Sequence, residues 1–190
     1  MSTAGRMVRM DCPDLDETPA LPLPPGFRLR LYEPGDEEAW VAMHRKADVF
    51  NTFSLDTFWG QFGTDRDLLR ERQVYLLDSQ DQLIGTASAW FQPGDPGLGR
   101  VHWVAILPEY QGQGLAKPLL ARVCDRLQAL GHTRAYLTTN TVRVPAICLY
   151  FSFGFLPSLD GTAREQDWQD FLARTVAEPR AAATRAFLEA

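Results

Sequence analysis

The chain has 190 residues, a formal net charge of −5 at pH 7 and 45% hydrophobic residues. This length suits one domain with a full core, and the composition excludes a mostly disordered chain. The acidic balance argues against nucleic-acid binding and mildly favours a cationic small molecule as ligand.

The cysteines and the lengths of the apolar runs further limit the class of protein. Cys12, Cys124 and Cys148 are an odd number without a C-x-x-C pair, so they predict neither a disulfide framework nor a metal site. No apolar run has the length of a membrane span, and the first ten residues lack the apolar stretch of a secretory signal. We therefore expect a soluble cytoplasmic protein that binds no membrane and no metal.

The two ends differ in pattern from the middle of the chain. Five prolines between Pro13 and Pro25 remove backbone donors, so we expect residues 1–26 to form a poorly ordered tail. The folded domain is expected over residues 27–158. Amphipathic patterns predict a helical extension over 159–190, packed on the domain or on a partner subunit, so a homodimer stays open.

The first half of the domain alternates between strand and helix patterns. Residues 27–31 read as a strand, and acidic residues after a Pro-Gly turn predict a helix over 36–47. An aromatic-rich stretch runs over 50–62, and Gly60 within it and Gly63 directly after it favour short helices. Period-two patterns then predict a hairpin of strands at 74–77 and 83–91, followed by a glycine-rich loop over 94–99.

The second half begins with the most apolar strand of the chain. Its near-continuous run over 101–107 indicates burial on both faces. Leucines at helical spacing predict a long helix from Leu115 to Leu130, and Gly131 suits the position after its end. A strand over 135–139 and a short helix over 145–153 complete a mixed α/β domain.

A glycine-rich turn joins the buried strand to the long helix. Its glycines let backbone N–H groups point inward, and the helix start adds positive partial charge, so the turn suits a phosphate or pyrophosphate. The alternative is a tight turn without a ligand. The turn lacks the Lys-Ser/Thr pair of a P-loop, and no third glycine follows as in a dinucleotide fingerprint.

Two motifs resemble those of the GNAT family of N-acetyltransferases. Gln111-x-x-Gly114-x-Ala116 is similar to the family's acetyl-CoA pyrophosphate loop, and Ala146-x-x-Leu149-Tyr150-x-x-x-Gly154-Phe155 is similar to its late motif. The resemblance covers about residues 27–156. It implies an α/β sheet flanked by helices with two splayed central strands. It also implies an acetyl-CoA-dependent N-acetyltransferase that transfers acetyl directly to a primary amine in a ternary complex.

The resemblance also assigns roles to residues. Main-chain groups at Val104 and Ile106 would bind the acetyl carbonyl and the pantetheine arm, and one amide would stabilise the oxyanion. Tyr150 would protonate the leaving thiolate, whereas an isolated tyrosine would by default be a packing residue. The implied acetyl-CoA contacts are Val104, Ile106, Gln111, Gly112, Gln113, Gly114, Leu115, Ala116, Lys117, Asn140 and Tyr150.

The base that deprotonates the amine is less clearly indicated. His102 lies on the strand expected to face the acetyl group, and its parity with Val104 and Ile106 favours a catalytic role. A buried histidine that packs beside Trp103 is the alternative. Glu109 is a weaker candidate, and His44 and His132 look peripheral.

The chain departs from the family at one position and leaves the acceptor unidentified. Arg143 stands where many members carry asparagine, and Asn140 is shifted from that place. Arg143 could bind a substrate carboxylate or a CoA phosphate, or it could be an exposed turn residue. The aromatics of 50–62 could form an acceptor pocket or ordinary core. A non-catalytic acyl-CoA-binding module, transfer to a hydroxyl, and a longer acyl donor remain alternatives.

Overall fold

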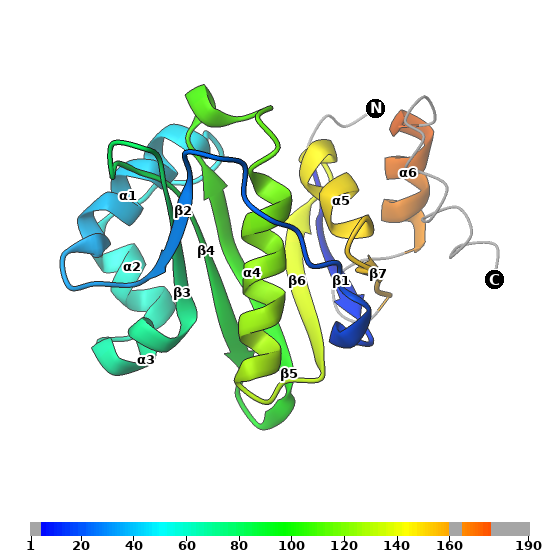
Figure 1. Ribbon diagram of the computed structural model, residues 1–190. Helices are drawn as coiled ribbons and strands as arrows, with labels where there is room; N and C mark the ends of the chain where they lie inside the picture. The colour runs from blue at the N-terminus through cyan, green and yellow to red at the C-terminus, as the bar shows by residue number, and fades with distance from the viewer. Residues whose placement is uncertain (1–4, 160–164, 176–190) are drawn as a thin grey trace.

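The computed structural model describes residues 5–159 and 165–175, which form a mixed α/β fold around one seven-stranded sheet (Figure 1). The strand order is β2-β3-β4-β5-β6-β1-β7. Every neighbouring pair is antiparallel except β5 and β6, which are parallel. The strands are β1 (Met7–Cys12), β2 (Arg28–Leu31), β3 (Gln73–Leu77), β4 (Leu83–Gln92), β5 (Asp95–Ile106), β6 (Arg134–Asn140) and β7 (Leu156–Pro157).

The helices lie on both faces of the sheet. They are α1 (Asp36–Ala47), α2 (Leu55–Phe62), α3 (Arg66–Arg72), α4 (Ala116–Ala129), α5 (Val144–Phe151) and α6 (Glu165–Thr175), with 3₁₀ turns η1 (Leu15–Glu17) and η2 (Pro108–Tyr110). Figure 1 shows α4 crossing the middle of the sheet. On β5, Gly99 faces Leu127 of α4, whereas His102 faces Phe62 of α2. Residues of opposite parity point to opposite faces, so α2 and α4 cover different sides of the sheet.

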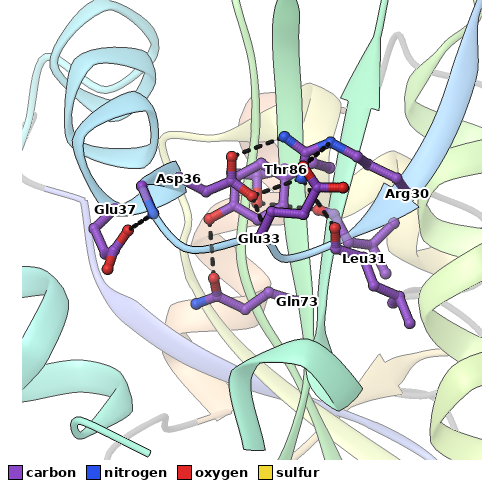
Figure 2. A network of polar contacts seen from close by, with 10 residues as sticks. Arg30, Leu31, Glu33, Asp36, Glu37, Gln73 and Thr86 are labelled. Atoms are coloured by element: carbon purple, nitrogen blue, oxygen red, sulfur yellow. Dashed lines mark hydrogen bonds and ion pairs between the residues drawn. The ribbon is translucent and has the colours of Figure 1, made fainter. Parts of the chain in front are cut away.

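A polar network fixes the start of α1 against the sheet (Figure 2). The guanidinium of Arg30 donates to both carboxylate oxygens of Asp36, at 2.6 and 2.8 Å, and the backbone N–H of Glu33 donates to the same carboxylate. Glu37 in turn accepts a hydrogen bond from the backbone N–H of Gly35. Because these contacts hold the first turn of α1, they also set the position of its last turn, which reaches the site described below.

The N-terminal segment differs from the prediction of a poorly ordered tail. Residues Met7–Cys12 form β1, which pairs with β6 over its whole length and with β7 at Met10 and Asp11. Val8, Met10 and Cys12 are buried, in alternation with more exposed residues. This period-two pattern precedes the first proline, and the prediction extended the effect of the prolines too far towards the N-terminus. Its partner strand lies about 130 positions away, so local sequence gives no sign of the pairing.

The loop predicted over residues 94–99 is also wrong, because β5 already begins at Asp95. Gly99 lies within the strand, and a Cβ atom there would lie 2.6 Å from Cδ2 of Leu127. The glycine therefore allows α4 to approach the strand closely, and it does not mark a turn. In α2 likewise, Gly60 lies inside the helix, and only Gly63 follows its end.

The C-terminal part contains α6, whose Trp168 and Phe171 are buried. The indole N–H of Trp168 donates to the carbonyl of Ser158, which joins α6 to the segment after β7. The second helical pattern, over residues 180–188, lies outside the described residues. Among the described helices, none has both the length and the apolar character needed to cross a membrane.

Candidate functional site

The parallel strands β5 and β6 pair only at one end and then separate. Their pairing covers Leu98–Arg100 of β5 and Arg134–Tyr136 of β6. Beyond these residues, the described parts of the two strands form no further ladder pairs with each other. The splayed central strands predicted from the family resemblance are therefore confirmed.

A cavity of about 870 Å³ occupies the gap between these strands. Its wall combines β5, β6, the start of α5, the end of α1 and the segment that leads into β1. It includes the predicted site residues His102, Val104, Ile106, Gln111, Asn140, Arg143 and Tyr150, together with Met7, His44, Asp48, Gln61 and Arg100. Half of the predicted catalytic and acetyl-CoA-binding residues thus line one cavity, whereas Gly112 to Lys117, in the turn and the first residues of α4, are not part of its wall.

A β-bulge in β5 directs backbone groups into the cavity. Thr86 pairs with Ala105 and Ser88 with His102, so two residues of β5 face Ala87 alone, and Trp103 has a φ of 50°. Beyond the bulge, the N–H of Leu107 donates to Ile84 on β4. Because alternate residues face the same neighbour in a ladder, the peptide groups of Val104 and Ile106 point the other way, towards the gap.

The turn after β5 presents free backbone donors. Among the described residues, the N–H groups of Gly114, Leu115, Ala116 and Lys117 donate to no backbone carbonyl, and α4 has no side-chain N-cap. Gly112 and Gly114 have φ values of 76° and 79°. The side-chain amide of Gln111 donates to the carbonyl of Ile106 at 2.9 Å, which ties the turn to the strand. Such a turn at a helix start suits an anion.

Tyr150 lies on α5 and lines the opposite wall of the cavity. Its ring packs at an angle against Phe155, with centroids 6.2 Å apart. Within the described part of the chain, its hydroxyl has no hydrogen-bond partner, so it is free to bond a ligand. Burial raises the pKa of Tyr150 to about 12, and the phenol is therefore protonated at neutral pH.

His102 is held by Gln61 in a defined tautomer. The indole N–H of Trp103 donates to Oε1 of Gln61 at 3.0 Å, and Nε2 of His102 lies 3.1 Å from the same oxygen. Because that oxygen is the acceptor for the indole, Nε2 must carry its proton and Nδ1 must be the unprotonated nitrogen. Burial lowers the pKa of His102 to about 3, so the ring is neutral at pH 7.

The predicted parity of His102 with Val104 and Ile106 is wrong, and the bulge is the reason. Directly paired residues share a face, so His102 shares its face with Ala105, as Ser88 does with Thr86. Ile106 pairs with Gly85 and points to the other face. One extra residue in a strand reverses the direction of every later side chain. His102 therefore faces α2, and its side chain packs beside Trp103 and Phe62.

His44, expected to be peripheral, lines the cavity instead. Its Nδ1 donates to the carbonyl of Trp40 at 2.9 Å, so Nε2 is the unprotonated nitrogen of the neutral ring. Burial lowers its pKa to about 4. The sequence offers no sign of this role, because His44 reaches the cavity only through the packing of α1 on β5.

Arg143 is neither a free exposed residue nor unpaired. Its guanidinium donates to the carboxylate of Asp48 at 2.7 Å, and it lies 5.7 Å from the ring centroid of Phe50. Asp48 also accepts hydrogen bonds from Asn51 and from the backbone of Phe50. Arg143 thus links the start of α5 to the loop after α1 across one side of the cavity.

Several predicted residues lie away from the cavity wall. Glu109 lies in η2 and is exposed, and Nδ1 of His132 bonds the carbonyl of Pro96 near the other end of β5. In the aromatic stretch, Phe53, Phe58 and Phe62 are buried core, whereas Phe50 is exposed beside the cavity. No group of three or more metal-ligating side chains occurs in residues 5–159 and 165–175.

Comparisons with known proteins agree with this geometry. The profile of the acetyltransferase (GNAT) family matches residues 37–155. The mycothiol acetyltransferase of Thermobispora bispora is 32% identical over 168 residues, which cover 82% of this chain and 55% of that protein. The mycothiol acetyltransferase of Actinosynnema mirum is 30% identical and covers 78% and 50%. The chain therefore spans about half the length of these curated relatives.

Solved structures support the same fold. A GCN5-related N-acetyltransferase from Sphaerobacter thermophilus superposes with a TM-score of 0.69 at 21% identity, covering 82% of this chain and 49% of that one. The ribosomal-protein-S18-alanine N-acetyltransferase from Escherichia coli gives 0.55 at 23% identity, covering 66% and 75%. Together with the family profile, the splayed strands and the glycine turn, these matches show that the chain belongs to the acetyltransferase (GNAT) family.

Proposed function

We propose that this chain is an acetyl-CoA-dependent N-acetyltransferase that transfers acetyl directly to a primary amine in a ternary complex. The observation that carries the proposal is the cavity between β5 and β6, which Gln111 lines at the start of the glycine turn and Tyr150 lines from α5. The free N–H groups of Gly114–Lys117 follow Gln111 in the same turn. The relatives named mycothiol acetyltransferase support acetyl transfer, but they are about twice as long. The acceptor is accordingly proposed only as a primary amine.

The donor would lie along the gap in the sheet. Its pyrophosphate would bind the N–H groups of the turn, and its pantetheine arm would pair with the peptide groups of Val104 and Ile106. The remaining residues of the turn, Gln111, Gly112 and Gln113, would shape this site, and Asn140 would flank it from the end of β6. The N–H of Val104 would stabilise the negative charge that develops on the acetyl oxygen.

The chemical step would be attack of the neutral amine on the thioester carbonyl, followed by loss of the CoA thiolate. Tyr150 would donate its proton to the sulfur as that bond breaks. The amine proton would leave through Nδ1 of His102, directly or through a water. Since burial keeps the imidazole neutral over the physiological range, its lone pair is always available, although its low pKa makes it a weak base.

The cysteines favour direct transfer over a covalent acetyl-enzyme. Cys12, Cys124 and Cys148 are buried, and none lines the cavity formed by the described residues. Burial raises the pKa of Cys12 to about 11 and also raises that of Cys124, so neither is a ready thiolate.

The test is release of CoA thiol from acetyl-CoA in the presence and absence of a panel of primary amines, with mass detection of the acetylated amine. We expect release that depends on the amine, and an enzyme mass that is unchanged after incubation with acetyl-CoA alone. Binding of acetyl-CoA without any amine-dependent release would indicate a non-catalytic acyl-CoA-binding module. A gain of 42 Da, the mass of one acetyl group, on the protein would contradict direct transfer.

A further inference from the structure

The ionisable side chains that line the cavity are either neutral or paired with an opposite charge, with one exception. Asp48 and Arg143 form an ion pair. The two histidines of the wall are neutral at pH 7 because burial lowers their pKa values, and the tyrosine is neutral because burial raises its pKa. Among the described residues of the wall, Arg100 therefore carries the one charge that has no counter-charge.

Among the described residues, no acidic side chain forms a hydrogen bond or an ion pair with Arg100. Its Nη2 donates to the hydroxyl of Thr138 at 3.3 Å, its Cζ lies 5.5 Å from the ring centroid of Tyr136, and its Nε is buried without a hydrogen-bond partner in the described chain. Burial lowers the pKa of this guanidinium. A partly buried cation without a partner is unfavourable unless a ligand supplies the opposite charge.

Arg9 shows that stacking on Tyr136 does not explain this lack of a partner. Its guanidinium lies 4.5 Å from the centroid of the same ring, but it pairs with the carboxylate of Asp11 at 2.7 Å. Arg9 also does not line the cavity. Two arginines thus contact one aromatic ring, and only the one that lines the cavity lacks a carboxylate.

The position of Arg100 excludes the pyrophosphate of the donor as its ligand. Arg100 and Tyr136 form the last residue pair before β5 and β6 separate, at the closed end of the gap. The seven residues from there to Leu107 span about 23 Å at the rise of a strand, and the glycine turn lies beyond that point. Arg100 pairs with Trp90 as His102 pairs with Ser88, so both side chains point to the α2 face.

We propose that Arg100 binds a carboxylate of the substrate at the closed end of the cavity. This inference rests on the proposed acetyltransferase function and narrows its substrate to one that carries a carboxylate. An arginine can bind a carboxylate with two parallel hydrogen bonds, and the Nη2 end of Arg100 is exposed. The carboxylate belongs to the acceptor amine or to a dicarboxylic acyl group of the donor. The acidic net charge of the chain favoured a cationic ligand, whereas Arg100 would bind an anionic group.

The acceptor arm of the test compares glycine, β-alanine and γ-aminobutyrate with their amides, with acetyl-CoA as donor. The measured quantity is the ratio of kcat/KM for each acid to that for its amide. We expect Arg100→Gln to lower this ratio about 10–100-fold, because a hydrogen-bonded charge pair is lost. Arg100→Lys should retain part of the ratio. Arg9→Gln is the matched control, and it should leave the ratio at the wild-type value.

The donor arm compares succinyl-CoA with acetyl-CoA on one amide acceptor. A fall in that ratio for Arg100→Gln, with no change in the acceptor arm, would assign the carboxylate to the donor. A third arm needs no turnover: N-acetylglycine should raise the melting temperature of the wild type more than N-acetylglycinamide does, and this difference should vanish in Arg100→Gln.

The three arms separate this inference from the proposed function. If no amine is acetylated but N-acetylglycine still stabilises the wild type through Arg100, the proposed function fails and the carboxylate site stands. If the wild type and Arg100→Gln give equal acid-to-amide ratios, equal donor ratios and equal melting shifts, the carboxylate site is refuted. An equal effect of Arg9→Gln would refute it too, since stacking on Tyr136 would then be the cause.

Discussion

Replacing Tyr150 by phenylalanine isolates the proposed proton donor from the fold. The hydroxyl has no partner in the described part of the chain, so its removal leaves no buried group unsatisfied, and the packing of the ring on Phe155 is kept. We therefore expect the free energy of unfolding to change by less than about 1 kcal/mol, a melting shift of at most about 4 °C. Loss of a general acid, by contrast, lowers kcat by about 10²–10⁴, or roughly 3–5 kcal/mol in activation free energy.

The assay is the amine-dependent release of CoA thiol, followed at saturating acetyl-CoA. Two controls make the result interpretable. The melting shift given by acetyl-CoA should be equal in both proteins, and kcat of the wild type should be insensitive to solvent viscosity, which shows that product release is not limiting. Under those conditions, an unchanged kcat in Tyr150→Phe would refute the reasoning and leave Tyr150 as a packing residue.

Other predictions concern pH and packing. The lowered pKa of His102 means that the unfolded state takes up a proton that the folded state does not. The contribution of His102 to the free energy of unfolding is therefore full above about pH 6.5 and falls as the pH decreases towards 3. In urea titrations between pH 6 and 4, His102→Gln should reduce the slope of the free energy of unfolding against pH by about 1.4 kcal/mol per pH unit. An unchanged slope would contradict the burial of His102. Because the His102 ring is already neutral above pH 6, the rise of kcat/KM with pH should follow the pKa of the acceptor amine. A rise near pH 6.5 that is common to all acceptors would contradict the lowered pKa of His102. Gly99→Ala should destabilise the fold by about 1–3 kcal/mol, because its Cβ would lie 2.6 Å from Leu127. Gly60→Ala has open space around it in α2 and should stabilise the fold by up to about 1 kcal/mol. Similar effects of the two variants on the melting temperature would contradict this explanation of Gly99.

Local periodicity predicted most of the helices and strands of this fold. The leucine spacing of α4 and the apolar run of β5 are strong patterns that tertiary contacts did not override. The strand β1 was missed because its pairing with β6 joins distant parts of the chain. The early start of β5 was missed because Gly99 is required by the approach of Leu127, which no local pattern indicates.

The residues of the site likewise fall into two groups, those that short motifs predicted and those that tertiary packing brings to the cavity. Of the residues carried by short motifs, Gln111 and Tyr150 line the cavity, and Gly112 to Ala116 form the turn that opens α4. Their roles towards acetyl-CoA stay predictions. The residues contributed by packing were missed, because α1 and α2 bring His44, Asp48 and Gln61 to the cavity from the other face of the sheet. The bulge at Trp103 reversed the parity argument for His102, and a bulge depends on pairing that sequence alone does not reveal.

The central claim is that acetyl-CoA binds at the turn that opens α4. The matched pair of variants is Gly114→Val and Gly94→Val. Both glycines have positive φ, 79° and 84°, and neither would bring a Cβ within 4 Å of another atom, so the two substitutions carry similar backbone strain. Only the side chain at position 114 would occupy the space that the pyrophosphate requires.

The direct measurement is the melting temperature of the wild type and both variants with and without acetyl-CoA. At a hundred times the dissociation constant, binding adds about 2.7 kcal/mol to the free energy of unfolding, which corresponds to a rise of about 5–11 °C for a chain of this size. We expect this rise in the wild type and in Gly94→Val, and its loss in Gly114→Val. No rise in the wild type at millimolar acetyl-CoA, or an equal rise in all three proteins, would contradict the account.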